Sequence, residues 1–253
     1  MKGNGGEGPP EERGGRVEIP DFGIEDELAP VMRRLRRDLR AAAEGLGPME
    51  ARYLVDSYYA IQDFRMQSGH QVGALDANGE PHLLIDWSAE AMRSLEDSIK
   101  AALDAWGKGQ PMARWARQIV GIGPVIAAGL VAHIDVRREP TVGHLWRFAG
   151  LDPTRQTMAK GEKRGWNAKL KVLCWKAGQS FMKKQNHPKD IYGKIYVARK
   201  RLEQERNDTG AYAEQAAAYL AAKRWGKDTE SYKAYSAGRL PKGQIDARAR
   251  RYQ

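Results

Sequence analysis

The residues best suited to chemistry stand at Gly121-Ile122-Gly123, inside the run Ile119-Val120-Gly121-Ile122-Gly123-Pro124-Val125. Two glycines around an apolar residue allow a tight turn and a close approach of the backbone to a partner. The helix expected to follow presents free amide groups and the positive end of its dipole, which attract phosphate. The pattern predicts a helix–hairpin–helix in which Gly121 and Gly123 offer backbone amides to phosphate. A plain glycine turn between two packed helices is the alternative.

Positive charge is concentrated in one segment of the chain. The 253 residues carry a formal net charge of +10, and residues 160–201 alone carry +11, with thirteen Lys or Arg against two acidic residues. Phosphates favour Lys and Arg through counterion release, and unpaired bases stack on aromatic rings. The segment therefore predicts nucleic-acid binding, against the alternative of a solvated basic face above an aromatic core. Its interleaved aromatic residues are Trp166, Trp175, Phe181, Tyr192 and Tyr196.

Groups suited to catalysis or to metal binding are scarce. The single cysteine, Cys174, excludes an internal disulfide and a cysteine zinc cluster, and the five histidines show no metal spacing. Asp86 follows Leu83-Leu84-Ile85, but one carboxylate cannot hold Mg²⁺, and we expect it on a helix surface. We expect no catalytic residue, no metal and no cofactor.

Hydrophobic periodicity predicts an all-α fold, with no segment alternating convincingly at period two. Asn78-Gly79 is also a strong turn signal for a β-hairpin, but the flanking patterns favour helix on both sides, and hence an antiparallel helical hairpin. A basic helix from Asn167 to about Lys184 carries the positive segment. Helices are expected at 24–45, 48–76, 88–106, 111–119, 124–134, 141–148, 167–184, from 188 or 190 to beyond 202, and at 211–225, 229–237 and 245–252.

Composition divides the chain into three parts, with a break at Gly107 to Pro111. Residues 1–22 are rich in Gly, Pro and Glu and are expected to form a disordered tail. Residues 23–110 form the helical hairpin or coiled coil, a common dimerisation element, and residues 111–253 form a nucleic-acid-binding domain. The N-terminus lacks the apolar core of a signal peptide and no apolar run is long enough to span a bilayer, so we expect a cytoplasmic protein without membrane contact.

A resemblance to known families rests on three motifs, the first of which begins with the glycine hairpin. GIGPVIAAGLVAHI, LWRFAGLDP (Leu145 to Pro153) and a Gly-x-Asn element (Gly165 and Asn167) resemble the C-terminal transposase domain of the RNA-bridged insertion-sequence recombinases. The chain is also similar to the Nop domain of box C/D ribonucleoproteins, in which a helical coiled coil precedes the RNA-binding domain. The closest resemblance is to the Tas proteins of TIGR-Tas systems, which are RNA-guided DNA-targeting proteins of prokaryotes and their viruses.

The resemblance implies a structured guide RNA with box C/D-like elements as the partner, target DNA recognised through guide pairing, a homodimer, and a role for a separate nuclease. In this interpretation the protein reads RNA shape and backbone while base pairing supplies specificity. Trp166 stands beside basic residues at a helix start, so we include it among the contacts, whereas Trp115, Trp146 and Phe148 are expected in the core. The candidate RNA-binding residues are Lys163, Arg164, Trp166, Asn167, Lys169, Lys171, Lys176, Tyr192, Lys194, Tyr196, Arg199 and Lys200.

The sequence departs from the recombinases in two respects. Those enzymes carry an N-terminal RuvC-like domain with four metal-binding carboxylates, and a serine after their Gly-Leu-x-Pro element. Here Arg155-Gln156-Thr157-Met158-Ala159 contains no serine, and Thr157 has no evident base near it. We therefore expect a protein without nuclease activity. The alternatives are a minimal transposase or recombinase of the same lineage, and a helix–hairpin–helix protein that binds DNA without RNA.

Overall fold

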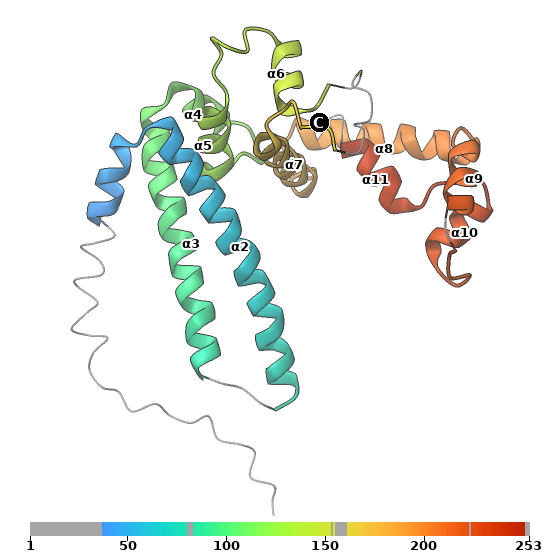
Figure 1. Ribbon diagram of the computed structural model, residues 1–253, viewed down its shortest axis with the longest axis horizontal. Helices are drawn as coiled ribbons and strands as arrows, with labels where there is room; N and C mark the ends of the chain where they lie inside the picture. The colour runs from blue at the N-terminus through green and yellow to red at the C-terminus, as the bar shows by residue number, and fades with distance from the viewer. Residues whose placement is uncertain (1–36, 80–82, 153, 155–160, 223, 251–253) are drawn as a thin grey trace, which may run out of the picture. The chain divides into compact units, whose positions relative to one another are not determined.

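The computed structural model describes residues 37–79, 83–152, 154, 161–222 and 224–250, and every regular element within these ranges is a helix (Figure 1). This confirms the predicted all-α fold. Most helix ends lie within a few residues of those expected, although the last helix, α11 (Lys242–Arg250), begins before the predicted Ile245. The predicted tail 1–22 and most of the first predicted helix lie outside the described residues.

Helices α2 (Pro48–Ala77) and α3 (Leu83–Gly109) are the longest and run antiparallel as a hairpin (Figure 1). Pro48 occupies the first turn of α2, and the Glu50 carboxylate accepts a hydrogen bond from the Gly47 N–H at 2.7 Å. Asn78 caps the end of α2, and Gly79 follows with a left-handed φ of 75°. The Asn-Gly pair thus ends a helix, and the helical hairpin is the arrangement that the structure adopts.

A buried carboxylate fixes the pairing of the two long helices. Glu96 of α3 accepts hydrogen bonds from Arg65 and from Gln62 of α2, the latter at 3.0 Å. Burial acts to raise the pKa of Glu96, but these bonds lower it overall, so the carboxylate is ionised. Burial and the bond to Glu96 raise the pKa of Tyr58 to about 12. Between Arg65 and Glu96, no described side chain of the hairpin is buried.

The main core lies where the base of the hairpin meets α4 (Pro111–Ala116), α5 (Pro124–His133) and α7 (Ala168–Lys183). Helix α5 is apolar on all sides and packs between α2 and α7. A Cβ on Gly129 would lie 2.7 Å from Leu173 and 3.2 Å from Val55, so a side chain here would displace these two core residues. The core joins residues from both sides of the predicted division at residue 110, and that division remains a prediction.

Helix α8 (Tyr192–Asp208) connects this core to a second apolar cluster formed around α9 (Ala213–Ala222), α10 (Glu230–Ser236) and α11. Its members include Tyr212, Tyr235 and Ile245. Helix α11 packs against both α8 and α7. None of the described helices combines the length and apolar character needed to cross a membrane.

Candidate nucleic-acid interface

The glycine motif forms the predicted helix–hairpin–helix, with α4 and α5 on either side of the turn. Gly121 has a left-handed φ of 99°, and a Cβ there would lie 2.8 Å from the Phe181 ring. Its carbonyl accepts a hydrogen bond from the Ser180 hydroxyl at 2.6 Å, which holds the hairpin against α7. Gly123 caps α5, and the position of its missing Cβ is open. Of the two predicted phosphate contacts, Gly121 therefore faces the protein and Gly123 adjoins open space.

The corner between α7 and α8 is packed too closely for a side chain. A Cβ on Gly193 would lie 2.6 Å from the Gln185 Cα and 2.7 Å from the Phe181 carbonyl. The buried Asp190 carboxylate accepts hydrogen bonds from the amides of Gly193 (3.1 Å) and Lys194 (2.9 Å), and so caps α8. Phe181 stacks on Tyr192 at 4.7 Å and also contacts the hairpin, so one ring joins the hairpin to this corner.

Four exposed lysines surround this corner, and we refer to them as the corner lysines. No described carboxylate lies within ion-pair distance of any of them; the Lys194 Nζ is 3.5 Å from the Pro188 carbonyl oxygen. Only Lys194 is among the contacts predicted from the sequence, although the position of all four at or after the end of the helix that holds the hairpin is a usable signal. They are Lys183, Lys184, Lys189 and Lys194.

The lysines on one side of α7 face the hairpin helix α2, and carboxylates of α2 neutralise them. Lys169 forms an ion pair with Asp56, and Lys176 lies 4.0 Å from the Asp63 carboxylate. Both partners are seven residues apart on their helices, so the two pairs share one register. The Lys176 ammonium also lies 3.9 Å from the centre of the Tyr59 ring. These two predicted RNA contacts are thus engaged in packing α7 against the hairpin, and their role toward RNA stays a prediction.

The start of α7 carries a second group of predicted contacts. Lys163 and Arg164 are exposed, whereas the half-buried Trp166 ring lies over Gly150, where a Cβ would come within 2.4 Å of it. Lys171 is exposed, with its ammonium 5.1 Å from the Trp166 ring. The structure therefore brings together the predicted residues Lys163, Arg164, Trp166 and Lys171 at this end of the helix.

Asn167 is a structural cap that ties α7 to α5. Its side-chain oxygen accepts a hydrogen bond from the Leu170 amide at 3.0 Å, and its Nδ2 lies 3.1 Å from the Nδ1 of His133. Burial, followed by the charge of Arg52, lowers the pKa of His133, so the ring is neutral and Nδ1 accepts from Asn167. His133 is buried and hydrogen-bonded, and so is part of the structure that holds α5 to α7.

The predicted contacts on α8 are largely engaged inside the protein. The Arg199 guanidinium lies 2.6 Å from the buried Glu203 carboxylate. The Lys200 ammonium lies 2.8 Å from Asp246 on α11, and the buried Tyr196 hydroxyl donates to the same carboxylate at 3.3 Å. Tyr192 is half-buried against Phe181. Among the predicted contacts on α8, Lys194 is the one whose ammonium is exposed without a described carboxylate partner.

Exposed tryptophans mark surfaces that the sequence had assigned to the core. Trp115 is 57% exposed and Trp146 49%, so the expectation that these two are core residues is wrong, while Phe148 does pack against the core. For Trp115 the reason is that the small residues Ala113 and Ala116 form the buried side of α4. Trp175 is 57% exposed and follows Lys171 by one helical turn.

Within the described residues, no three His, Cys, Asp or Glu side chains lie close enough to hold a metal ion. Asp86 lies exposed on α3, as expected. Thr157 and its neighbours lie outside the described residues.

A comparison with protein families found a match within this region. Residues 113–193 match the model of the IS116/IS110/IS902 transposase family. This segment is transposase-like. It covers about a third of the chain, begins in α4 and ends at Gly193, and so encloses the hairpin, α7 and three of the four corner lysines. No curated protein and no solved structure matched the chain. The match supports the predicted transposase-related lineage.

Proposed function

We propose that the chain binds a structured guide RNA and directs it to target DNA, without nuclease activity of its own. The observation that carries this proposal is the meeting of the helix–hairpin–helix with the corner lysines, inside the transposase-like segment. Gly123 at the open start of α5 provides one backbone amide for a phosphate, since Pro124 after it has no N–H, and the corner lysines provide charge at the neighbouring end of α7.

Helix α7 gives the interface its length. Its 16 residues extend about 24 Å at the usual rise per residue, with Lys163, Arg164 and Lys171 near its start and the corner lysines at or beyond its end. Two groups of cations at this separation suit a folded RNA that presents phosphates from different parts of its backbone. Specificity for DNA would come from the guide, as in other RNA-guided proteins. The likeness to TIGR-Tas proteins and to the Nop domain belongs to this proposal.

The distal half of the α2–α3 hairpin supports a homodimer. Several of its apolar side chains are more than half exposed: Phe64 (55%), Leu84 (63%) and Trp87 (67%). Exposed apolar surface of this kind is typical of an association site. A second copy placing the same hairpin alongside would cover it on both protomers at once.

The decisive experiment is to purify the chain expressed with its native neighbouring DNA, and to sequence the bound nucleic acid with and without RNase treatment. A discrete small RNA with paired box-like motifs is the expected result. Duplex DNA retained without RNA would contradict the proposal and favour a helix–hairpin–helix protein that works alone.

The corner lysines provide the site-specific test. K183Q/K184Q should weaken binding of that RNA about tenfold, because two phosphate contacts are lost. The matched control is K100Q/K227Q, which removes the same charge from exposed lysines of α3 and of the segment between α9 and α10. Equal weakening by both variants would show a non-specific charge effect and contradict the assignment of the interface.

The family match also supports a second candidate, a minimal transposase of the same lineage. Because metal-assisted strand cleavage needs clustered carboxylates, such a protein would depend on a partner to supply them. Mg²⁺-dependent cutting of DNA by the chain with its partner, abolished by Thr157→Ala, would establish this function in place of the non-catalytic one.

A further inference from the structure

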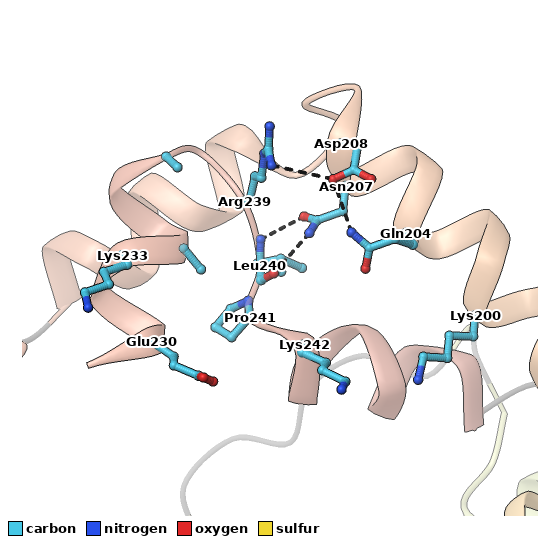
Figure 2. Close-up of a pocket in the computed structure, with 12 residues that line it drawn as sticks. Lys200, Gln204, Asn207, Asp208, Glu230, Lys233, Arg239, Leu240, Pro241 and Lys242 are labelled. Carbon is cyan, nitrogen blue, oxygen red and sulfur yellow. Dashed lines mark hydrogen bonds and ion pairs between the residues drawn. The ribbon is translucent and has the colours of Figure 1, made fainter. Parts of the chain in front are cut away.

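A pocket outside the transposase-like segment lies between α8, α10 and the stretch that leads into α11 (Figure 2). Its walls are joined by structural bonds: the buried Asn207 donates to the Leu240 carbonyl at 3.0 Å and accepts from the Leu240 amide at 2.8 Å (Figure 2). Lys200 of its lining is paired with Asp246 at 2.8 Å. This pocket thus belongs to the packing of the last described helices, whereas α7 presents an aromatic ring to solvent.

The solvent-facing side of α7 combines a large aromatic ring with a cation. Trp175 is 57% exposed and Val172, three residues earlier, is 52% exposed. Lys171 is exposed one turn before Trp175, and side chains at this spacing on a helix are neighbours. The buried side of the same helix is formed by other residues, among them Leu170 and Leu173. The packing of α7 therefore leaves more than half of Trp175 in solvent.

A second tryptophan, Trp166, holds the ammonium of Lys171 in place. The half-buried Trp166 ring lies against Gly150, where a Cβ would come within 2.4 Å of it. The Lys171 ammonium lies 5.1 Å from the centre of this ring, within the range of a cation–π interaction. The two rings therefore have different roles. Trp166 positions Lys171, and Trp175 offers its surface to a partner.

The charge around this face determines which partner it suits. Residues 163–183 contain six Lys or Arg and no acidic residue, and no described carboxylate pairs with Lys171. A second copy that presented the same positive face would be repelled, whereas a polyanion is attracted. An aromatic ring beside a phosphate-binding cation is typical of sites for unpaired nucleotides, because a base that is not stacked in a duplex can lie on the ring.

We propose that the exposed face of α7 binds an unpaired stretch of the guide RNA, with Trp175 stacking on a base and Lys171 contacting a neighbouring phosphate. Val172 adds an apolar contact to the same stretch. The site rests on the proposed RNA binding, and it names the part of the RNA that this helix contacts. The folded part of the RNA is left to the helix–hairpin–helix and the corner lysines. Unpaired DNA presents the same base and phosphate chemistry, and the experiment separates the two sources.

The test uses the full chain at low salt and three probes. They are a blunt RNA duplex, the same duplex with a single-stranded tail of about ten uridines, and the same duplex with an equally long tail of thymidines, since single-strand sites span about this length. We expect Trp175→Ala to bind the uridine-tailed duplex about tenfold more weakly than wild type, because one stacked base is lost. Its binding of the blunt duplex should be unchanged. Thermal unfolding checks that each variant is folded.

Two controls separate stacking from charge. Trp115→Ala removes an equally exposed ring from α4 and should bind the uridine-tailed duplex as wild type does, and Trp175→Phe should keep most of the affinity because it keeps an aromatic face. The salt slope of Trp175→Ala should equal that of wild type, since stacking releases no counterions. The slope of Lys171→Gln should fall by about 0.7, and that of the exposed Lys100→Gln should not change.

The outcomes distinguish this inference from the proposed function. If wild type binds the RNA probes and Trp175→Ala binds the uridine-tailed duplex as Trp115→Ala does, α7 is not the site of the unpaired stretch and the inference is overturned, while RNA binding stands. An equal loss of Trp175→Ala on blunt and tailed duplexes also overturns it, because the ring would then contact paired RNA. Tighter binding of the thymidine tail than of the uridine tail overturns the assignment to RNA. If wild type binds none of the probes, the proposed RNA binding itself fails.

Discussion

Helices α7 and α8 are both rich in lysine and arginine, but they differ in how much of that charge is available to a polyanion. On α8, four of the five cations lie within 4.0 Å of a carboxylate: Arg199, Lys200, Arg201 and Arg206. On α7, Lys169 and Lys176 are neutralised by α2, while Lys171 and Lys183 have no described carboxylate partner. Formal charge therefore overstates the affinity of α8 for phosphate, and the difference directs the search for the RNA surface to α7 and its ends.

The strongest test of this comparison is to remove the carboxylate that pairs with two of the α8 cations, Arg199 and Arg206. Glu203 is buried, lies 2.6 Å from Arg199 and accepts a hydrogen bond from Tyr212. Glu203→Gln should destabilise the protein by about 3 kcal/mol, because Arg199 loses its charged partner in a buried setting. Urea unfolding measures this, with the exposed Glu205→Gln as control, expected within about 0.5 kcal/mol of wild type.

The same carboxylate predicts a dependence of stability on pH. Burial acts to raise the pKa of Glu203, but the hydrogen bond from Tyr212 and the charge of Arg199 lower it overall, below the ordinary 4.5. A lowered pKa in the folded state means that the stabilisation is complete above the unfolded value and is lost as the pH falls through the folded one. Unfolding measured between neutral pH and pH 3 should show a steeper loss in wild type than in Glu203→Gln; parallel curves would contradict the assignment.

Trp175 provides a second test, of whether α7 contacts the RNA. Since it is exposed one turn after Lys171, it is placed to stack on an unpaired base, and Trp175→Ala should reduce RNA affinity by about 1–2 kcal/mol. Binding titrations at fixed salt measure this, and unfolding should be unchanged because the ring is exposed. Trp115→Ala, which removes an equally exposed ring from α4, is the control. Equal losses from both variants would place the RNA elsewhere.

Removing the carboxylates that neutralise two lysines of α7 should have a smaller effect on RNA affinity, and should increase it. D56N/D63N removes the carboxylates that face Lys169 and Lys176. We expect RNA affinity to rise about threefold, because the released cations add to the field at the interface. Stability should fall by about 1 kcal/mol, since the two pairs are partly exposed. Unchanged affinity would show that this side of α7 stays covered when RNA is bound.

The smallest change is expected on the exposed side of α8. Arg201 is exposed and lies 3.0 Å from Glu205, so Arg201→Gln should alter RNA affinity by less than about twofold. A filter-binding assay beside K183Q/K184Q makes the contrast direct. A tenfold loss at Arg201 would reverse the ranking of the two helices.

The sequence predicted the helices well because local signals determine them. Apolar residues at three- and four-residue intervals, Pro48, Pro111 and Pro124 at helix starts, and caps at Thr141 and Asn167 all act within one or two turns. The pairs of α8 were also accessible, since Arg199–Glu203 and Arg201–Glu205 are separated by one turn of the same helix.

Which lysines of α7 pair with a carboxylate could not be predicted from the sequence. Lys169 meets Asp56, 113 residues earlier, and this pairing depends on the packing of α2, α5 and α7 rather than on local pattern. The exposure of Trp115 was missed for a related reason: the alanines that form the buried side of α4 give little hydrophobic signal beside a tryptophan. Charge and aromatic content pointed to a segment as the candidate interface, and tertiary packing determines which of its side chains are exposed and unpaired with a described carboxylate.

The two ion pairs between α2 and α7, at matching seven-residue intervals, fix the position of α7 along the hairpin. Helix α2 has 30 residues and so extends about 45 Å; its first half is joined to α7 by these pairs, and its second half packs on α3. Two chains joined through the exposed apolar side chains of the distal half of the hairpin would hold their α7 helices at a set separation. Lengthening both hairpin helices by whole turns would then increase the spacing between the two bound segments of a guide in proportion.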